Sequence, residues 1–247
     1  LIDQLSRDGF DSIVVIGFHL SHRVLDYIEL IKPSVKASIY FVEESSPGGT
    51  AGAMLAASPY LEDTFVLVMG DLVTDFSFHD FYHFSTGLSA DVSLVTRITD
   101  HPEDSDLILV SAYSTLHQFS LRLPDRSQPM NGSTPPLGNT GIFFFSRKFV
   151  LSEVKTLPSD IHEIISKILD NQRYQSRNYK LCYYFTSELI RDVGSITRLA
   201  AVNDTLQSPT PSQRNRRYRL PALFLDKDNT LVLDSAASIP SNISLIC

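Results

Sequence analysis

Carboxylates stand within two residues of a glycine at two distant points of the chain. Asp71 follows the apolar run FVLVMG, and Asp192 precedes a Val-Gly pair. In open α/β sheets, ligands bind beyond the carboxyl ends of the strands, where a carboxylate can hold Mg²⁺ that bridges to substrate phosphates. A single Gly-Asp after a strand more often starts a loop or caps a helix. Two such carboxylates would share one metal if the fold brings them together.

A glycine-rich turn, residues 47–52 with the sequence PGGTAG, follows a predicted strand and opens a predicted helix. Glycine lets backbone N–H groups approach a ligand, and the start of a helix favours anions. The turn is neither a P-loop nor the G-x-G-x-x-G of dinucleotide-binding folds. On its own it is also compatible with a tight strand-to-helix turn.

A second pair of carboxylates, Asp226 and Asp228, lies in the segment FLDKDNT, directly after an apolar run. The first is placed to attack phosphorus and form an aspartyl-phosphate. The second is placed to protonate the leaving oxygen and later activate water, with Mg²⁺ neutralising charge. The alternative is a solvated acidic turn.

Composition limits the class of protein. Of 247 residues, 43 % are hydrophobic and 20 % are charged, and the formal net charge is −7. These values indicate a globular protein with a sizeable core and disfavour a broadly basic nucleic-acid surface. Two cysteines exclude a disulfide scaffold and favour a reducing compartment, and no apolar run approaches the ~20 residues that span a bilayer. We therefore expect a cytoplasmic protein that binds neither nucleic acid nor membrane.

Apolar strand-like runs alternate with helix-like segments along the chain. Strands with Val, Ile and Phe on both faces, separated by helices, predict an α/β fold with a mostly parallel sheet covered on both sides. The predicted strands are residues 12–18, 37–43, 64–70, 91–98, 106–112, 141–146 and 180–186. The predicted helices are residues 21–31, 50–58, 77–86, 147–156 and 159–172.

Composition changes near residue 204 and divides the chain into three predicted regions. They are an α/β domain (1–204), a linker with prolines and a basic cluster (205–219), and the start of a second α/β domain (220–247). The basic cluster could bind a phosphate-rich partner, but charge runs at domain boundaries are usually only solvated. Because the chain starts at Leu1 inside an amphipathic pattern and the second domain is short, we expect a fragment.

Four segments in this order resemble the sugar-phosphate nucleotidylyltransferases: residues 40–55 (YFVEESSPGGTAGAML), 65–71 (FVLVMGD), 139–145 (NTGIFFF) and 190–202 (IRDVGSITRLAAV). The resemblance covers roughly residues 1–205 and implies a Rossmann-like, doubly wound sheet. It also implies an enzyme that joins a sugar 1-phosphate to a nucleotide and releases pyrophosphate. The stretch HPEDSDLI resembles the branch that acts on heptose 1-phosphate with GTP.

The resemblance implies roles for particular residues. Asp71 and Asp192 match the Mg²⁺ ligands of the family, and Gly49 and Thr50 match its nucleotide-contacting turn. Glu44 matches the residue that reads the base. A carboxylate can accept hydrogen bonds from both N1–H and the exocyclic amine of guanine, which adenine and uracil do not offer as a pair. We therefore expect GTP to be preferred.

On the sugar side, Asn139 and Gly141 match the family segment that contacts the sugar phosphate. Three features of the family pattern differ here. The glycine-rich phosphate loop is expected before Leu1, and residues 194–198 read GSITR where the family has G-T-P-E-R. The lysine expected ahead of the N-T-G segment is not evident, and Arg122 or Arg126 could replace it.

The segment around Asp226 and Asp228 resembles the first motif of haloacid dehalogenase-like phosphatases, which implies that both aspartates also bind Mg²⁺. A transferase followed by such a phosphatase resembles the fused enzymes of nucleotide-activated heptose synthesis. In these, the phosphatase removes the 7-phosphate from a heptose bisphosphate, and the transferase then activates C1.

Alternatives to a bifunctional enzyme stay open. The altered segment 194–198 is compatible with a non-catalytic subunit that senses a nucleotide or sugar phosphate, and a third reading makes the first domain a scaffold for the phosphatase. By themselves, residues 1–247 are expected to be inactive in both reactions.

His79 and His83 stand at i and i+4 without a recognisable third ligand, which disfavours a metal site. The sequence leaves homo-oligomerisation open.

Overall fold

The computed structural model describes residues 1–99, 106–109, 120–122, 137–155, 157–172, 179–207 and 215. All of them lie in the first of the two units into which the chain divides, Leu1–Arg217 and Tyr218–Cys247. Within the described ranges, no helix is both long and apolar enough to cross a bilayer. The boundaries predicted at residues 204 and 219 stay predictions.

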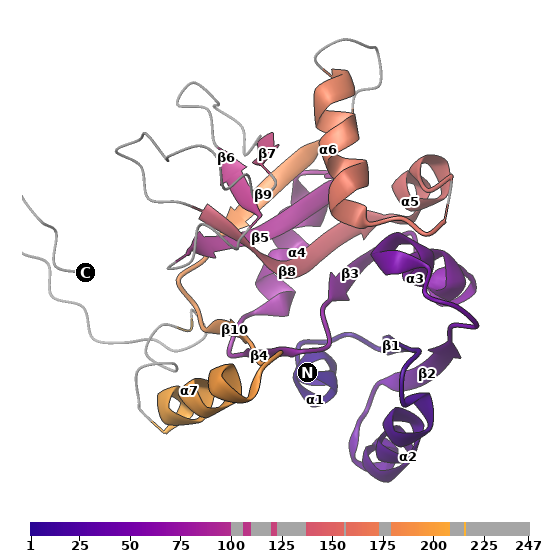
Figure 1. Ribbon diagram of the computed structural model, residues 1–247, viewed down its shortest axis with the longest axis vertical. Helices are drawn as coiled ribbons and strands as arrows, with labels where there is room; N and C mark the ends of the chain where they lie inside the picture. The colour runs from indigo at the N-terminus through magenta and orange to yellow at the C-terminus, as the bar shows by residue number, and fades with distance from the viewer. Residues whose placement is uncertain are drawn as a thin grey trace, which may run out of the picture. The chain divides into compact units, whose positions relative to one another are not determined.

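The chain begins with a short helix, α1 (Ile2–Arg7), followed by a parallel pair of strands. Strand β1 (Ser12–Gly17) pairs with β2 (Ser38–Glu43), and helix α2 (Ser21–Ile31) connects them through a short 3₁₀ turn (Lys32–Ser34). Leu1 and Leu5 pack against one of the two hydrophobic cores that the described residues form. The predicted strand–helix–strand order is confirmed here, and Figure 1 shows these elements beside the main sheet.

The main sheet has six strands in the order β7-β6-β8-β5-β9, with β3 paired to β8. Their bounds are β3 (Thr64–Val68), β5 (Val92–Ile98), β6 (Leu107–Leu109), β7 (Ser120–Arg122), β8 (Leu137–Ser146) and β9 (Leu181–Phe185). Strand β8 is antiparallel to β3, β5 and β6, whereas β5 and β9 are parallel. Strands β3, β5, β6 and β9 therefore run in one direction, which confirms the predicted mostly parallel α/β fold, and β7 and β8 run in the opposite direction.

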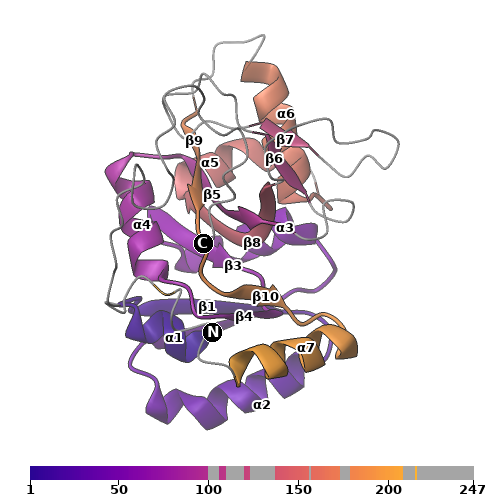
Figure 2. The same cartoon turned by 90° about the vertical axis from the view of Figure 1, so that its left-hand side faces the viewer.

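Helices cover both faces of this sheet, as Figures 1 and 2 show. Helices α3 (Gly49–Ala57), α5 (Arg147–Glu153) and α6 (Ile161–Gln172) pack on one face, and α4 (Phe78–Gly87) packs on the other. Strand β8 serves both cores because its side chains alternate. Phe143 and Phe145 join the core under α3, α5 and α6, while Ile142 and Phe144 join the core under α4.

Three elements near the carboxyl edge were missed from the sequence. Strand β4 (Leu72–Thr74) pairs antiparallel with β10 (Ile190–Asp192), and helix α7 (Ile196–Leu206) follows directly. Each strand has only three residues, which is too short to leave an alternation in the sequence. Ser195 caps α7 by accepting a hydrogen bond from the backbone N–H of Arg198 at 3.2 Å. Helix α7 continues two residues into the segment predicted as a linker.

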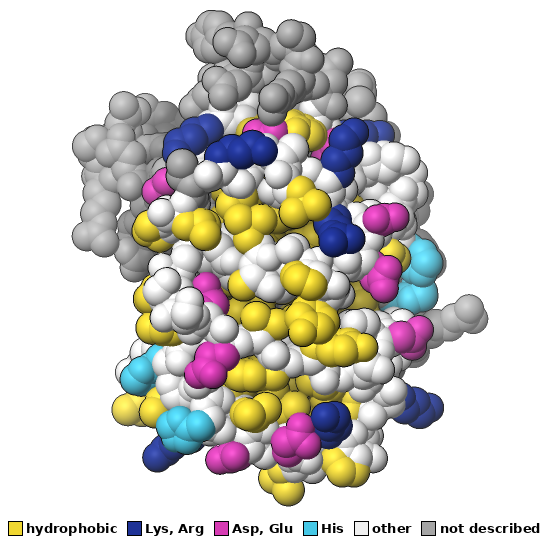
Figure 3. All heavy atoms as spheres, turned by 90° about the vertical axis from the view of Figure 1, so that its right-hand side faces the viewer, with side chains coloured by type: hydrophobic (Ala, Val, Ile, Leu, Met, Phe, Trp, Pro, Cys, Tyr) yellow, Lys and Arg dark blue, Asp and Glu magenta, His cyan; other side chains and the backbone are white. Residues whose placement is uncertain are grey.

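Apolar side chains run along much of the surface seen from the right-hand side of Figure 1, where α3, α5 and β2 lie (Figure 3). Among the exposed apolar residues are Tyr40 and Tyr60, whose ring centroids are 5.1 Å apart. Much of any folded protein's surface is apolar, so these residues alone do not define an interface. Homo-oligomerisation therefore stays a prediction.

We expect Phe144→Ala to lower the free energy of unfolding by about 3–5 kcal/mol, because the fully buried ring leaves a cavity in the core under α4. Phe18→Ala is the matched control, since that ring is 46 % exposed, and it should cost about 1 kcal/mol or less. Urea denaturation of both variants measures the difference. Equal losses of unfolding free energy in the two variants would contradict the burial of Phe144 in the core under α4.

Candidate active site

The pairing of β4 with β10 brings Asp71 and Asp192 together. Asp71 immediately precedes β4, Asp192 is the last residue of β10, and the N–H of Val193 donates to the carbonyl oxygen of Asp71 at 2.8 Å. A Cβ placed on Gly194 would lie 3.4 Å from Oδ2 of Asp71 and 3.7 Å from Oδ1 of Asp192. Both carboxylates therefore face one small volume, which the missing side chain of Gly194 leaves open.

Arg198 forms an ion pair with Asp192 through its guanidinium group. Asp71 is exposed, and the side chains of the ion pair are also half exposed, with 44 % exposure for Asp192. The arginine comes from the first turn of α7, at the end of the segment where the sequence differs from the G-T-P-E-R pattern. One of the two converging carboxylates is therefore already partnered by a cation in this structure.

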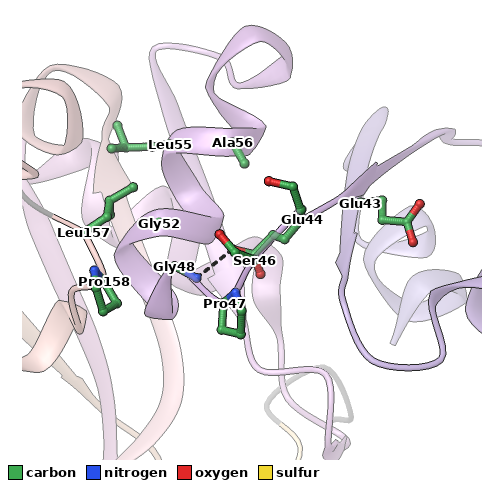
Figure 4. Close-up of a pocket in the computed structure, with 11 residues that line it drawn as sticks. Glu43, Glu44, Ser46, Pro47, Gly48, Gly52, Leu55, Ala56, Leu157 and Pro158 are labelled. Carbon is green, nitrogen blue, oxygen red and sulfur yellow. Dashed lines mark hydrogen bonds between the residues drawn. The ribbon is translucent and has the colours of Figure 1, made fainter.

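The glycine-rich turn borders a cavity of about 470 Å³, which we call the turn cavity. It is lined by Glu43, Glu44, Ser45, Ser46, Pro47, Gly48, Gly52, Leu55, Ala56, Leu157 and Pro158. The Glu44 side chain bends toward the turn, where Oε1 accepts a long hydrogen bond from the N–H of Gly48 at 3.4 Å (Figure 4). Glu43 points the other way and accepts a hydrogen bond from Ser21 on α2. Of the two glutamates, only Glu44 turns its carboxylate toward the glycine-rich turn.

Gly49 and Thr50 join the start of α3 to the segment before α6. Gly49 has φ = +71°, and a Cβ there would lie 2.4 Å from the carbonyl oxygen of Ser159. The hydroxyl of Thr50 accepts a hydrogen bond from the N–H of Ile161 at 2.9 Å. Neither residue lines the turn cavity. Both have a clear structural task, and their nucleotide-binding role stays a prediction.

A second cavity of about 520 Å³, the sheet-edge cavity, lies where β5, β8, β10, α6 and α7 meet. The predicted sugar-side residues Asn139 and Gly141 line it together with the predicted metal ligand Asp192. Its other charged lining residues are Arg97, Asp106, His162, Arg191 and Arg198. Residues predicted for two parts of the substrate therefore share one cavity.

Asn139, Asp106 and His162 form a closed triangle in this cavity. The N–H of Asn139 donates to the carbonyl oxygen of Asp106 at 2.9 Å, and the Asp106 carboxylate pairs with Nδ1 of His162 at 2.6 Å. Nε2 of His162 then lies 3.5 Å from Nδ2 of Asn139. Asp106, just before β6, and Asn139, on β8, thus hold the imidazole of His162 on α6 in a fixed orientation, with Nε2 toward Asn139.

His162 has a raised pKa in this setting. Burial of the imidazole opposes protonation, but the hydrogen bond that the ring donates to the Asp106 carboxylate, and the negative charges of Asp106 and Asp160, outweigh burial and raise the pKa above the usual 6.5. The backbone N–H of His162 also donates to Asp160 at 2.8 Å, which fixes the start of α6. The side chain therefore carries a positive charge over a wider pH range than an ordinary histidine.

Gly141 marks a bulge in β8 at the edge of this cavity. The register between β5 and β8 shifts between the pairs Leu94–Phe143 and Thr96–Asn139. Gly141 has φ = +79°, and a Cβ there would lie 2.9 Å from Cγ of Met69. Bulges often turn a side chain toward a site, and this one follows Asn139 directly. Its glycine is required by the backbone, and its contact with a sugar stays a prediction.

Several predicted residues lie outside the part of the chain that the structure describes. They are Asp226, Asp228, Arg126 and the side chain of Arg122. His79 and His83 are described, and their ring centroids are 4.2 Å apart. Among the described residues no group of three or more His, Cys, Asp or Glu side chains could hold a metal.

Sequence reasoning missed Asp106 and His162 as a pair. Asp106 lies in the HPEDSDLI stretch, which resembles a family branch but was given no role for this aspartate. His162 lies in a predicted helix without a motif. No spacing rule links the two, because the contact forms only when β6 and the start of α6 meet. Arg97 and Arg191 were missed for the same reason.

The family model described as nucleotidyl transferase matches residues 1–208. The chain therefore belongs to the nucleotidyl transferase family, and its fold and family are those of enzymes that make sugar nucleotides. The matched region includes Asp71, Asp192 and both cavities. No curated protein matches the chain at a significant level.

Solved structures share the fold at low sequence identity. HddC from Yersinia pseudotuberculosis is 18 % identical, with a TM-score of 0.61 and coverage of 83 % of each chain. The same protein complexed with GMP-PN is 17 % identical, with a TM-score of 0.62 and the same coverage. A Bacillus anthracis protein assigned as a glucose-1-phosphate thymidylyltransferase, in complex with sucrose, is 17 % identical, with a TM-score of 0.68 and coverage of 84 % of this chain and 80 % of that one.

We expect Gly49→Ala to destabilise the protein by about 1–2 kcal/mol from the positive φ alone, with a further cost from the contact with Ser159. Gly87→Ala is the matched control, because it ends α4 with no atom within 4 Å of the added Cβ, and it should be neutral or slightly stabilising. Thermal unfolding compares the two. A neutral Gly49→Ala would contradict the described turn.

We expect the His162 pKa to lie above 6.5 in the wild type and to fall toward or below 6.5 in Asp106→Asn, measured by NMR of the imidazole. Glu163→Gln should leave it unchanged, because Glu163 faces Lys167 on the exposed side of α6. A raised folded-state pKa stabilises the fold below about pH 6.5, and this contribution is lost as the pH rises through the folded-state pKa. The difference in free energy of unfolding between wild type and Asp106→Asn should be largest below about pH 6.5 and should shrink as the pH rises through the folded-state pKa of His162. A His162 pKa below 6.5 in the wild type would refute the pairing with Asp106.

Proposed function

We propose that the protein transfers GMP from GTP to a sugar 1-phosphate, specifically a heptose 1-phosphate, and releases pyrophosphate. The observation that carries the proposal is the convergence of Asp71 and Asp192 beside the cavity that contains Asn139. In the reaction, a phosphate oxygen of the sugar 1-phosphate attacks the α-phosphorus of GTP in line. Catalysis of this kind comes mostly from positioning and electrostatic stabilisation.

The two carboxylates suit a magnesium ion. Mg²⁺ in phosphate-transferring sites is usually held by one or two carboxylates, with water and substrate phosphates as the other ligands. Asp71 and Asp192 supply that donor set, and Gly194 keeps the space between them free of a side chain. Family members generally use a divalent metal such as Mg²⁺. When bound, it would neutralise the charge that develops on the phosphates.

Guanine is the proposed base, with Glu44 as the residue that reads it. The Glu44 carboxylate lies in the turn cavity and has only the long hydrogen bond from Gly48 among the contacts described for it. An ionised carboxylate can accept both donors of guanine. The crystallisation of HddC with GMP-PN is consistent with a guanine nucleotide in this fold.

The heptose and the second activity rest on sequence motifs. The stretch of residues 101–108 supports a heptose 1-phosphate, and Asp226 with Asp228 supports a phosphatase that acts first on a sugar bisphosphate. In that order, one domain removes a phosphate from the far end of the sugar and the other activates C1. Release of inorganic phosphate from a heptose bisphosphate by the full-length protein, and its loss in Asp226→Asn, tests the second activity.

We expect Asp71→Asn and Asp192→Asn each to lower Mg²⁺-dependent pyrophosphate release by the full-length protein about 100-fold or more, since a metal contributes several kcal/mol to transition-state stabilisation. Asp26→Asn, on the exposed face of α2, is the control and should retain activity. If the wild type depends on Mg²⁺ but the Asp71 and Asp192 variants are fully active, the metal binds to other residues and the assignment is wrong. A wild type that binds nucleotide without transfer would support the sensing subunit instead.

We expect GTP to bind more tightly than ATP or UTP, and Glu44→Gln to remove about 1–3 kcal/mol of that preference, because the neutral amide cannot accept both guanine donors. Glu43→Gln is the matched control, since Glu43 faces Ser21, and it should keep the preference. Competition binding with the three nucleotides measures both variants. Equal affinity of the wild type for GTP and UTP would refute the guanine assignment. If Glu44→Gln keeps the full preference for GTP, a residue other than Glu44 reads the base.

A further inference from the structure

The Asn139 amide has a fixed orientation in the sheet-edge cavity. Its Oδ1 accepts a hydrogen bond from the N–H of Gly141 at 3.2 Å, so Nδ2 is the atom that faces Nε2 of His162 at 3.5 Å. The other ring nitrogen, Nδ1, is held by the Asp106 carboxylate at 2.6 Å. The ring edge also packs at 89° against Phe143, which restricts its rotation.

This geometry gives His162 two distinct states. When the imidazole is neutral, with its proton on Nδ1, Nε2 can accept a hydrogen bond from the Asn139 amide. When the imidazole is protonated, Nε2–H and the Asn139 Nδ2–H are both donors and cannot bond to each other. Two adjacent donors, one of them on a cation, then need a common acceptor, and an anionic oxygen is the strongest partner for them.

Most of the charged side chains that line the cavity with His162 are basic. The cavity is lined by three arginines, Arg97, Arg191 and Arg198, and by two aspartates, Asp106 and Asp192. Each aspartate already has a positively charged partner, His162 for Asp106 and Arg198 for Asp192. Just before α6, Asp160 accepts a hydrogen bond from the backbone N–H of His162, and on α6 the neighbouring Glu163 faces Lys167.

We infer that His162, oriented by Asp106 and acting together with the Asn139 amide, binds the phosphate group of the sugar 1-phosphate. This inference rests on the proposed function for the identity of the anion. A charge-assisted hydrogen bond from the imidazolium and a second one from the amide would hold the phosphate beside Asp192. The sugar-side subsite is thus a pH-dependent one, with binding present below the His162 pKa and lost as the pH rises through it.

Sulfate tests the subsite without nucleotide, metal or turnover, because it mimics a phosphate group and stays a dianion across the relevant pH range. Its affinity for the 247-residue protein is measured by isothermal titration calorimetry, a readout that works equally in variants without the imidazole. At about pH 6, we expect the wild type to bind sulfate roughly tenfold more tightly than His162→Gln, and the difference should vanish well above the His162 pKa. His83→Gln, at an exposed position of α4, is the control and should bind sulfate as tightly as the wild type.

The role of Asp106 has a separate readout. Asp106→Asn should shift the pH profile of sulfate binding to lower pH without abolishing binding at low pH, which a purely structural defect would not do. In the wild type, glucose 1-phosphate should shift the NMR signal of the His162 imidazole and glucose should not, because the ligand is the phosphate and not a hydroxyl. Equal sulfate affinity of wild type and His162→Gln at every pH would overturn the inference. Sulfate binding at His162, together with a full-length protein that shows no transferase activity, would uphold the subsite and refute the proposed function instead.

Discussion

The antiparallel contact between β4 and β10 is the interaction on which the candidate active site depends. It joins only three residue pairs, yet it sets Asp71 beside Asp192 from segments far apart in the sequence. So short a ladder is stabilised by packing, because Leu72 and Ile190 are buried in the aromatic core under α4. The hydroxyl of Thr74 adds a hydrogen bond to the carbonyl oxygen of Leu189 at 2.8 Å. The convergence of the carboxylates is therefore a consequence of the core.

A second contact connects the turn cavity with the sheet-edge cavity. The turn before α3 pairs with Ser159, and Thr50 accepts a hydrogen bond from Ile161, the residue before His162. The start of α3 and the start of α6 are thus built as one rigid corner. The side chain proposed to read the base and the side chain proposed to hold the sugar phosphate are positioned by the same few backbone hydrogen bonds.

The sequence predicted the α/β class and most long elements, because buried strands and amphipathic helices leave clear apolar patterns. It did not predict that β8 is reversed, since an apolar run such as residues 142–145 carries no sign of strand direction. Asp71 and Asp192 were found because Asp71 directly follows a glycine after a strand and Asp192 stands two residues before another glycine. Asp106 and His162 were not found as a pair, because their contact depends on how β6 and α6 meet in the fold.

The most direct test of the central claim is where a divalent metal binds. Paramagnetic Mn²⁺, added with GTP, broadens NMR signals of nearby nuclei, so the backbone amide of Gly194, between the two carboxylates, reports on the site. The account predicts strong broadening of the Gly194 signal, much weaker broadening of the signal of Gly87 at the end of α4, and loss of the effect when Asp71 and Asp192 are both changed to Asn. Broadening of Gly194 no greater than that of Gly87 would contradict it.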